Sequence, residues 1–348
     1  MKYTNVLQIK ILLLLVNLVF IANCDGQTTE HFDIPINGKL VYVEGLQGEG
    51  WLTANPFGEL VLLDGAEQKR HVLTWDGYFY AHPNLTPDGK SLIFESKRSR
   101  NIGLVGLSAE SDLYRMDLET REIIGINDEL SDLIGEPVGN RISYPSLSPT
   151  GNKLSFIRFK DNDFHLSYID FQGRQIIDIM KDHTKRPIGS SVMSWSPNED
   201  FIIYTMSDRF DTYVVLVKLE EKESKIIENE ITADTLNTGV LSCMSGNWKN
   251  EAEFIYSCSK AGLGYRQIYS YNVDSEISTK LLKLKNSAFP DAITELIVSR
   301  DGNQLIIISG PRDDFRSDIH RMEVNTQQII PITSSGTIKQ WLRLYEDM

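Results

Sequence analysis

The most regular feature of the chain is a tight turn followed by a strand-like alternation of apolar residues. In each copy the fourth and sixth residues after the first residue of the turn are large and apolar, as Leu92 and Phe94 are after Asp88. Alternation with period two is typical of a strand with one buried face, and Asp-Gly or Asn-Gly before it is typical of a tight hairpin. The copies occupy residues 37–43, 88–94, 150–156, 198–204, 250–256 and 301–307.

These copies recur at steps of 51, 62, 48, 52 and 51 residues. A repeat of that length indicates a solenoid or a propeller. A strand precedes the turn at 83–87, 145–149 and 193–197; third strands are expected at 112–117, 166–170, 213–217, 267–271 and 318–322, and fourth strands at 122–124 and 327–330. Four antiparallel strands in each of six units predict an all-β, six-bladed β-propeller.

The two ends of the chain carry complementary parts of one blade. The first unit lacks an upstream inner strand, whereas the last unit is followed by an unused strand-like segment, 337–344. We expect this segment to complete the N-terminal blade and close the ring. A C-terminal helix is the alternative, because Trp341, Leu342, Leu344 and Tyr345 also form a helical stripe. The predicted division is a signal peptide over 1–24, a short segment over 25–36 and one propeller domain over 37–348.

The repeat also resembles a known family. Residues 85–96 (LTPDGKSLIFES), followed by 111–117 (SDLYRMD), resemble the PD40 repeat of TolB-like propellers, and 146–151 and 194–198 repeat the pattern with substitutions. In the last two copies Lys249 and Arg300 replace the proline. The resemblance covers the chain from about Asn37 to its C-terminus. It implies the fold and, for function, an interaction platform, a sensor or occasionally an enzyme.

The N-terminus is typical of an export signal. Lys2 and Lys10 are followed by an apolar run over 11–22, which is short for a membrane span. Residues 21–24 are similar to a bacterial lipobox, which would make Cys24 the lipidated first residue; a plain secretory cut after Cys24 and a retained anchor are the alternatives. With the resemblance, this predicts an exported protein of a Gram-negative bacterium, periplasmic or anchored as a lipoprotein.

The net charge of the chain argues against some classes of binding partner. A formal net charge of -13 repels nucleic acid and anionic lipid, so we expect no nucleic-acid partner and membrane contact only through a lipid anchor. Beyond Cys24 only Cys243 and Cys258 remain, equidistant from the turn at Asn250 and therefore opposite each other on adjacent strands. They form either a disulfide or a pair of small buried thiols.

Motifs for metal binding and nucleophilic catalysis are missing from the sequence. It contains no His-Glu-x-x-His, Cys-x-x-Cys or Gly-x-Ser-x-Gly, so we predict no metal, no cofactor and no catalytic residue. Of the six histidines only His82 falls on an inner strand, at a position matched by Tyr144, Val192, Met244 and Glu295. Some propellers of the resembled fold class are oligogalacturonate lyases with a His-rich metal site, which makes such an enzyme the alternative.

Arginines recur between the second and third strands of five units, as Arg98, Arg100, Arg158, Arg209, Arg266, Arg312 and Arg316. Ion pairing between blades is one interpretation. A charged rim for an acidic ligand or partner is the other, because these corners and the connections between blades lie on one face of a propeller. The connection over 127–140 mixes leucines with acids and is expected to be a partner-binding flap or a short surface helix.

The leading functional hypothesis is a non-enzymatic, monomeric binding or scaffolding propeller of the cell envelope that presents a loop face to a protein or glycan. Its candidate binding residues are Arg98, Arg100, Arg158, Arg209, Arg266, Arg316, His82 and Tyr144. One alternative is a carbohydrate-active enzyme similar to oligogalacturonate lyase that uses the central funnel. A second alternative is a sensor subunit of an envelope complex.

Overall fold

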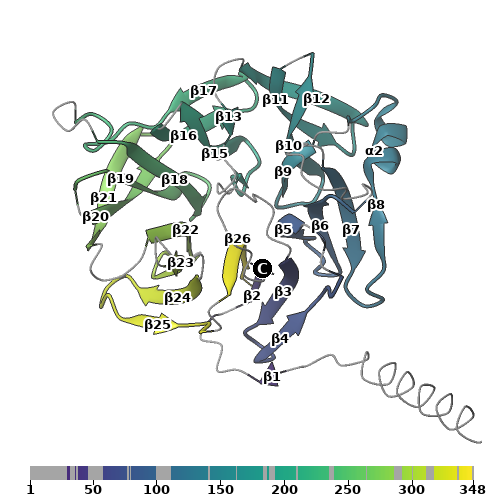
Figure 1. The fold of residues 1–348 in the computed structure, drawn as a ribbon. Coiled ribbons are helices and arrows are strands. Elements are labelled where there is room, and N and C mark those ends of the chain that lie inside the picture. Colours follow the sequence, from purple (N-terminus) through teal and green to yellow (C-terminus); the bar gives the residue numbers. More distant parts are fainter. Residues whose placement is uncertain are drawn as a thin grey trace, which may run out of the picture.

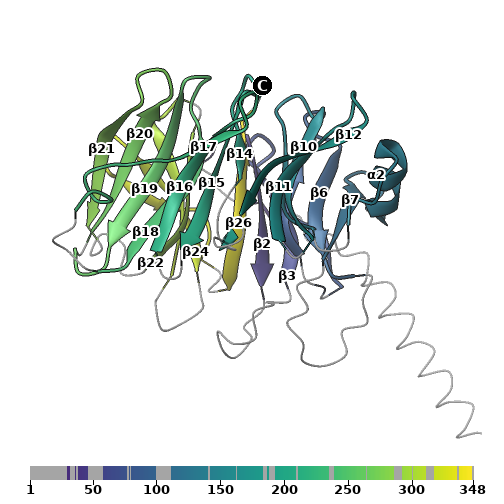
Figure 2. The same ribbon diagram turned by 90° about the horizontal axis from the view of Figure 1, so that it is seen from above.

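The protein is an all-β, six-bladed propeller whose sheets surround a central axis (Figure 1). The computed structural model describes residues 30–31, 36, 38–45, 58–76, 78, 80–98, 111–139, 142–161, 163–182, 186–187, 193–208, 211–234, 239–263, 265–285, 292–299, 301–310, 317–334 and 337–346. The single helix within these ranges, α2 (Asn127–Ile134), lies at the outer edge of the second blade (Figure 2). This is the surface helix expected in that connection.

Blades two to six follow the predicted order of strands, counted from the axis outward. The second blade comprises β5 (Tyr80–Leu85), β6 (Ser91–Ser96), β7 (Asp112–Asp117) and β8 (Ile123–Gly125), and the third comprises β9 (Ile142–Leu147), β10 (Lys153–Lys160), β11 (Asp163–Asp170) and β12 (Gln175–Asp182). The fourth comprises β13 (Arg186–Pro187) and β14 (Ser194–Trp195), which both pair with β15 (Phe201–Asp208), then β16 (Asp211–Lys218) and β17 (Glu223–Ile226). The fifth comprises β18 (Leu241–Trp248), β19 (Glu253–Lys260), β20 (Tyr265–Asn272) and β21 (Ile277–Lys285), and the sixth β22 (Ala292–Val298), β23 (Gln304–Gly310), β24 (Asp318–Glu323) and β25 (Ile329–Pro331).

The first blade combines both ends of the chain. Its strand order from the axis is β26 (Ile338–Tyr345), β2 (Lys39–Gly45), β3 (Gly58–Asp64) and β4 (Lys69–Val72), with β1 (Glu30–His31) at the outer edge. The C-terminal segment is thus a strand, not a helix. Gly38 makes this approach feasible: its φ is +92°, and a Cβ there would lie 2.1 Å from the carbonyl oxygen of Tyr345.

Apolar side chains of neighbouring blades pack face to face. Between the first and second blades, for example, Val41 and Leu60 belong to one buried cluster with Leu92 and Phe94. The residues at alternate positions that the sequence predicts as one buried face therefore supply the inter-blade core. Burial of this apolar surface is the main force that holds the blades together.

Polar side chains join the inner strands around the axis. The inner strand of each blade has one edge without a neighbouring strand, and its backbone groups need other hydrogen-bond partners where they are buried. At every junction a side chain of one blade hydrogen-bonds the backbone of its neighbour. The bonds are Tyr345 to Leu85 N (2.8 Å), Asn84 to Pro145 O (2.8 Å), Ser146 to Met193 O (2.8 Å), Trp248 to Ser194 O (3.3 Å), Asn247 to Val298 O (2.7 Å) and Glu295 to Leu342 N (2.7 Å).

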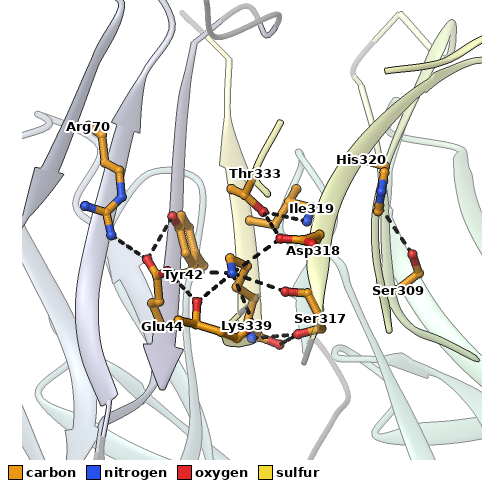
Figure 3. Close-up of polar contacts among 11 residues, drawn as sticks. Tyr42, Glu44, Arg70, Ser309, Ser317, Asp318, Ile319, His320, Thr333 and Lys339 are labelled. Carbon is orange, nitrogen blue, oxygen red and sulfur yellow. Dashed lines mark hydrogen bonds and ion pairs between the residues drawn. The ribbon is translucent and has the colours of Figure 1, made fainter. Parts of the chain in front are cut away.

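A buried lysine adds an ionic link between the sixth and first blades (Figure 3). The side chain of Lys339 on β26 is fully buried, and its Nζ lies 3.6 Å from carboxylate oxygens of both Glu44 and Asp318. It also donates to Thr337 Oγ1 (2.7 Å) and Ser317 O (3.1 Å). The charge of Lys339 is therefore compensated on several sides, which a buried ammonium requires.

The two cysteines of the fifth blade form a disulfide. The register of β18 and β19 places Cys243 opposite Cys258, as their spacing predicts, and their Cα atoms are 4.0 Å apart. None of the helices in the described ranges has the length and hydropathy to cross a membrane.

Candidate functional site

A depression of about 510 Å³ lies on the propeller axis where the inner strands end. Each of the six blades contributes to its lining, through Arg343, Leu85, Leu147, Trp195, Trp248 and Ile297. It opens on the face that carries the turns between first and second strands. The C-terminus reaches the same face close to the axis (Figures 1 and 2). We call this hollow the axial depression.

The repeated turns form the apolar rim of the axial depression. Pro87 and Pro197 are exposed there, and Pro149 is half-buried. Each turn is held by its own hydrogen bonds, such as Thr86 N to Ser91 O (2.8 Å) in the second blade. The motif that predicts the fold therefore also builds a rigid, mostly apolar rim, which suits binding of a ligand that needs little rearrangement of the protein.

Arg343 on β26 is the unusual residue of the lining. Its Nη1 atom is buried and has no hydrogen-bond partner, and its guanidinium forms no ion pair with any residue that the structure describes. Burial lowers the pKa of Arg343, although the charges of Tyr345 and Glu295 oppose this shift. The other cations of the lining are paired: Lys39 Nζ lies 3.6 Å from Asp64 and Lys249 Nζ lies 3.3 Å from Glu253.

A polar cluster lies deeper along the axis, at the junction of the second and third blades. His82, two residues before the lining residue Asn84, has its ring centroid 4.6 Å from that of Tyr144. Glu95 on β6 accepts hydrogen bonds from Tyr144 N (3.1 Å) and Ser111 Oγ (2.6 Å), and its Oε2 is 4.0 Å from His82 Nε2. The structure thus brings together the two matched inner-strand positions that the sequence singled out.

Both aromatic residues of this cluster sit at strained backbone positions. His82 has a φ of +50° and Tyr144 a φ of +58°, beside irregularities in the pairing of β5 with β6 and of β9 with β10. Such conformations are uncommon for residues other than glycine. The repeat imposes the same distortion at the same place in two blades, and in the third blade the N–H of Tyr144 bonds Glu95 of the neighbouring blade.

Burial sets the ionisation of the cluster. It raises the pKa of Glu95 to about 7, against the opposing hydrogen bonds from Ser111 and Tyr144. It also lowers the pKa of His82 well below its usual value, an effect that Arg343 reinforces. Near neutral pH the cluster therefore contains a neutral imidazole beside a carboxyl group that titrates in that range. Such a pair can exchange a proton, but both side chains are only 6% exposed.

The predicted arginine corners lie on the opposite face, at the other end of the inner strands. Arg98 pairs with Asp76 and donates to Tyr80 Oη (2.6 Å). Arg158 is buried and donates twice to Asp178 Oδ1, at 2.8 and 3.1 Å. Because Asp178 belongs to β12, this ion pair is within the third blade, whereas the sequence interpretation placed such pairs between blades.

Arg266 on β20 is also engaged inside its own blade. It donates to Ser242 O (3.2 Å) and Ser257 Oγ (3.1 Å), and burial lowers its pKa to about 10. The remaining candidates, Arg100, Arg209, Arg312 and Arg316, lie outside the described residues, as do Cys24 and the rest of the predicted export signal. Within the described part of the chain, no three His, Cys, Asp or Glu side chains are grouped so as to hold a metal ion.

Sequence reasoning did not select Arg343, although a signal for it exists. In every blade the fourth residue after the start of the turn lies on the second strand and pairs with a residue of the inner strand. In the first blade this pair is Val41 and Arg343. The corresponding inner-strand partners in the second to sixth blades are Leu85, Leu147, Trp195, Trp248 and Val298. Aligning the C-terminal strand with the other inner strands would have shown a charge in an apolar column.

Comparison with known proteins gives the fold. No family model matches the sequence, and no curated protein matches it. Among solved structures, TolB from Acinetobacter baumannii aligns with a TM-score of 0.62 at 14% identity, over 89% of this chain and 67% of that one. A proposed TolB from Agrobacterium tumefaciens aligns at 0.56 and 12% identity, over 90% of this chain and 100% of that one.

An oligogalacturonate lyase from Vibrio parahaemolyticus has the same architecture, with a TM-score of 0.52 at 13% identity over 88% of this chain and 84% of the lyase. At these identities the likeness concerns the fold alone. Together with the six blades and the repeated turns, these similarities lead to one conclusion. The chain has the fold of the TolB-like six-bladed β-propellers.

Proposed function

We propose that the protein is a non-enzymatic binding propeller of the cell envelope that holds a segment of a protein partner in the axial depression. One observation carries this proposal: all six blades converge on an apolar-rimmed hollow lined by a guanidinium whose buried Nη1 atom has no hydrogen-bond partner. A concave site with mostly apolar walls and a few polar groups is the usual form of a binding site. Export through the signal over 1–24, the lipid anchor at Cys24 and a monomeric state are parts of the same proposal.

The axial depression is a better candidate for the site than the arginine face. The guanidiniums of Arg98, Arg158 and Arg266 already bind atoms of their own chain, and those of Arg158 and Arg266 are buried, so a ligand would have to displace these bonds. The depression, by contrast, offers apolar surface and a guanidinium that forms no ion pair among the described residues. Structural similarity to TolB proteins fits an envelope protein but does not identify the partner.

Site-specific photo-cross-linking tests the proposal. A photoreactive amino acid at exposed Pro197, on the rim, is compared with the same group at exposed Asp161, on the opposite face. With envelope extract and irradiation, we expect one defined protein adduct from position 197 and none from position 161. An adduct confined to position 161, or adducts from neither position with several extracts, would contradict binding in the axial depression.

A carbohydrate-active enzyme is the second candidate, favoured by the pairing of His82 with Glu95 near the axis and by the likeness to oligogalacturonate lyases. Turnover of an anionic oligosaccharide that is lost in His82→Ala would support it over the binding role. A sensor subunit is the third candidate, and a dedicated membrane protein recovered as the cross-linked partner would favour it.

A further inference from the structure

One inner-strand position differs in chemistry between the first blade and the other five. The register places Arg343 in a ring with Leu85, Leu147, Trp195, Trp248 and Val298, all apolar. Four of these five side chains are less than 9% exposed. An apolar residue in the first blade would complete the ring, so the arginine at this position is not explained by packing.

The surroundings compensate the charge of Arg343 only in part, through the charges of Tyr345 and Glu295. Its Nη1 is buried without an acceptor, and its guanidinium makes no ion pair among the described residues. Glu295, whose charge acts on Arg343, uses its Oε2 to accept the backbone N–H of Leu342 (2.7 Å). A buried guanidinium nitrogen without an acceptor destabilises a fold, and perturbed charged groups concentrate where proteins bind ligands.

Lys339, four residues earlier on the same strand, is a buried cation with a full set of acceptors. It has two carboxylates at 3.6 Å and three oxygen acceptors between 2.7 and 3.2 Å (Figure 3). Lys339 and Arg343, the two cations compared on β26, therefore differ in the number of acceptors around them. Lys339 is surrounded by acceptors, whereas Arg343 lines the depression with its buried Nη1 atom not hydrogen-bonded.

We propose that Arg343 anchors a carboxylate of the bound segment, either an Asp or Glu side chain or a C-terminus. This proposal rests on the proposed binding function and specifies its ligand. A guanidinium binds a carboxylate through two parallel N–H···O bonds, which would supply the acceptors that Arg343 lacks. The protein as a whole repels acids, with a net charge of -13, so a local cation inside an apolar rim selects where an acidic segment can bind.

The stability of Arg343→Met separates a ligand anchor from a structural residue. If Arg343 is unpaired in the free protein, methionine of similar length should raise the unfolding midpoint, by roughly 1–2 °C for each kcal/mol gained in a chain of this size. Lys339→Met, the matched control on the same strand, should lower it. A lower midpoint for Arg343→Met would show that the guanidinium stabilises the fold and would overturn the proposal.

Binding of defined peptides tests the carboxylate directly. Three pools of random hexapeptides serve as probes: one with Asp and Glu and an amidated C-terminus, one with Asn and Gln and a free C-terminus, and one with neither carboxylate. We expect the full-length protein to retain at least one carboxylate pool roughly tenfold or more above the neutral pool, and Arg343→Met to lose that difference. The pool that is retained identifies the source of the carboxylate. Equal retention of all three pools would overturn the proposal.

Cross-linking from position 197 then distinguishes the role of Arg343 as a carboxylate anchor from the proposed binding in the axial depression. In an Arg343→Met background we expect the adduct to fall roughly tenfold or more, whereas Arg115→Met, which removes a guanidinium from β7, the third strand of its blade, should leave it unchanged. An undiminished adduct in Arg343→Met would refute the anchor while the binding function stands. Failure of the unmodified protein to form any adduct would refute the binding function itself.

Discussion

Replacing Glu95 by glutamine should remove a pH-dependent loss of stability. Glu95 is buried between the second and third blades and accepts hydrogen bonds from Tyr144 N and Ser111 Oγ. Burial raises its pKa from 4.5 to about 7, so the folded protein favours the protonated carboxyl. Glutamine has nearly the same shape and stays neutral at every pH. The substitution therefore tests the ionisation without removing the side chain.

The sign and size of the effect follow from the two pKa values. Below about pH 4.5 the carboxyl is protonated in both states, and its contribution to stability is fully present. As the pH rises to about 7 the unfolded chain ionises first, so stability falls and then stays low. One pKa unit corresponds to 1.36 kcal/mol, which makes the total loss about 3 kcal/mol. Glu95→Gln should lack this loss.

Urea denaturation at several values between about pH 4.5 and pH 8 measures the effect. The stability of Glu95→Gln relative to the unmodified protein should increase by about 3 kcal/mol across this range. His82 has a lowered pKa and acts in the opposite direction, losing stability as pH falls, but it is present in both proteins and cancels in the difference. Exposed Glu119→Gln controls for the change of net charge. If Glu95→Gln and the unmodified protein show parallel pH profiles, the assignment of a buried, titrating carboxyl is wrong.

Three further substitutions test how the ring is held. Lys339→Met should lower the free energy of unfolding by about 1–3 kcal/mol, because oxygens of Ser317 and Thr337 lose their donor while Arg70 still pairs with Glu44; urea denaturation checks this, and an unchanged midpoint would contradict it. Serine at both Cys243 and Cys258 should lower stability by about 3 kcal/mol, the value for a closed loop of some 15 residues, and reductant should then have no further effect on the melting temperature. Asn84→Ala should cost about 1–3 kcal/mol, since the Pro145 carbonyl loses its donor, and hydrogen exchange should become faster in β9 while strands of the sixth blade stay protected.

The sequence predicts the blades because their signals are local. Turn residues such as Asp88 and Gly89 and the alternation after them depend on neighbours within a few positions, so each hairpin is visible in a short window. Even the pairing of β26 with β2 follows from counting strands, because a missing inner strand at one end matches a surplus strand at the other.

The candidate site was harder to predict because it depends on contacts between distant segments. His82 and Tyr144 were selected by their matched positions, and the structure places their rings together. The importance of Arg343, however, depends on what lies around it, and the missing acceptor at its Nη1 atom cannot be read from residues 340–346. The arginines of the opposite face were conspicuous in the sequence, but Arg158 turned out to be paired with Asp178 inside its own blade.

The structure of the cross-linked complex is the most direct test of the account. After capture from position 197, we predict a segment of the partner lying in the axial depression between the turns of Pro87, Pro149 and Pro197. One of its carboxylates should lie within hydrogen-bond distance of the Arg343 guanidinium. A partner bound to the opposite face, around Asp161, with the depression left free, would contradict the account.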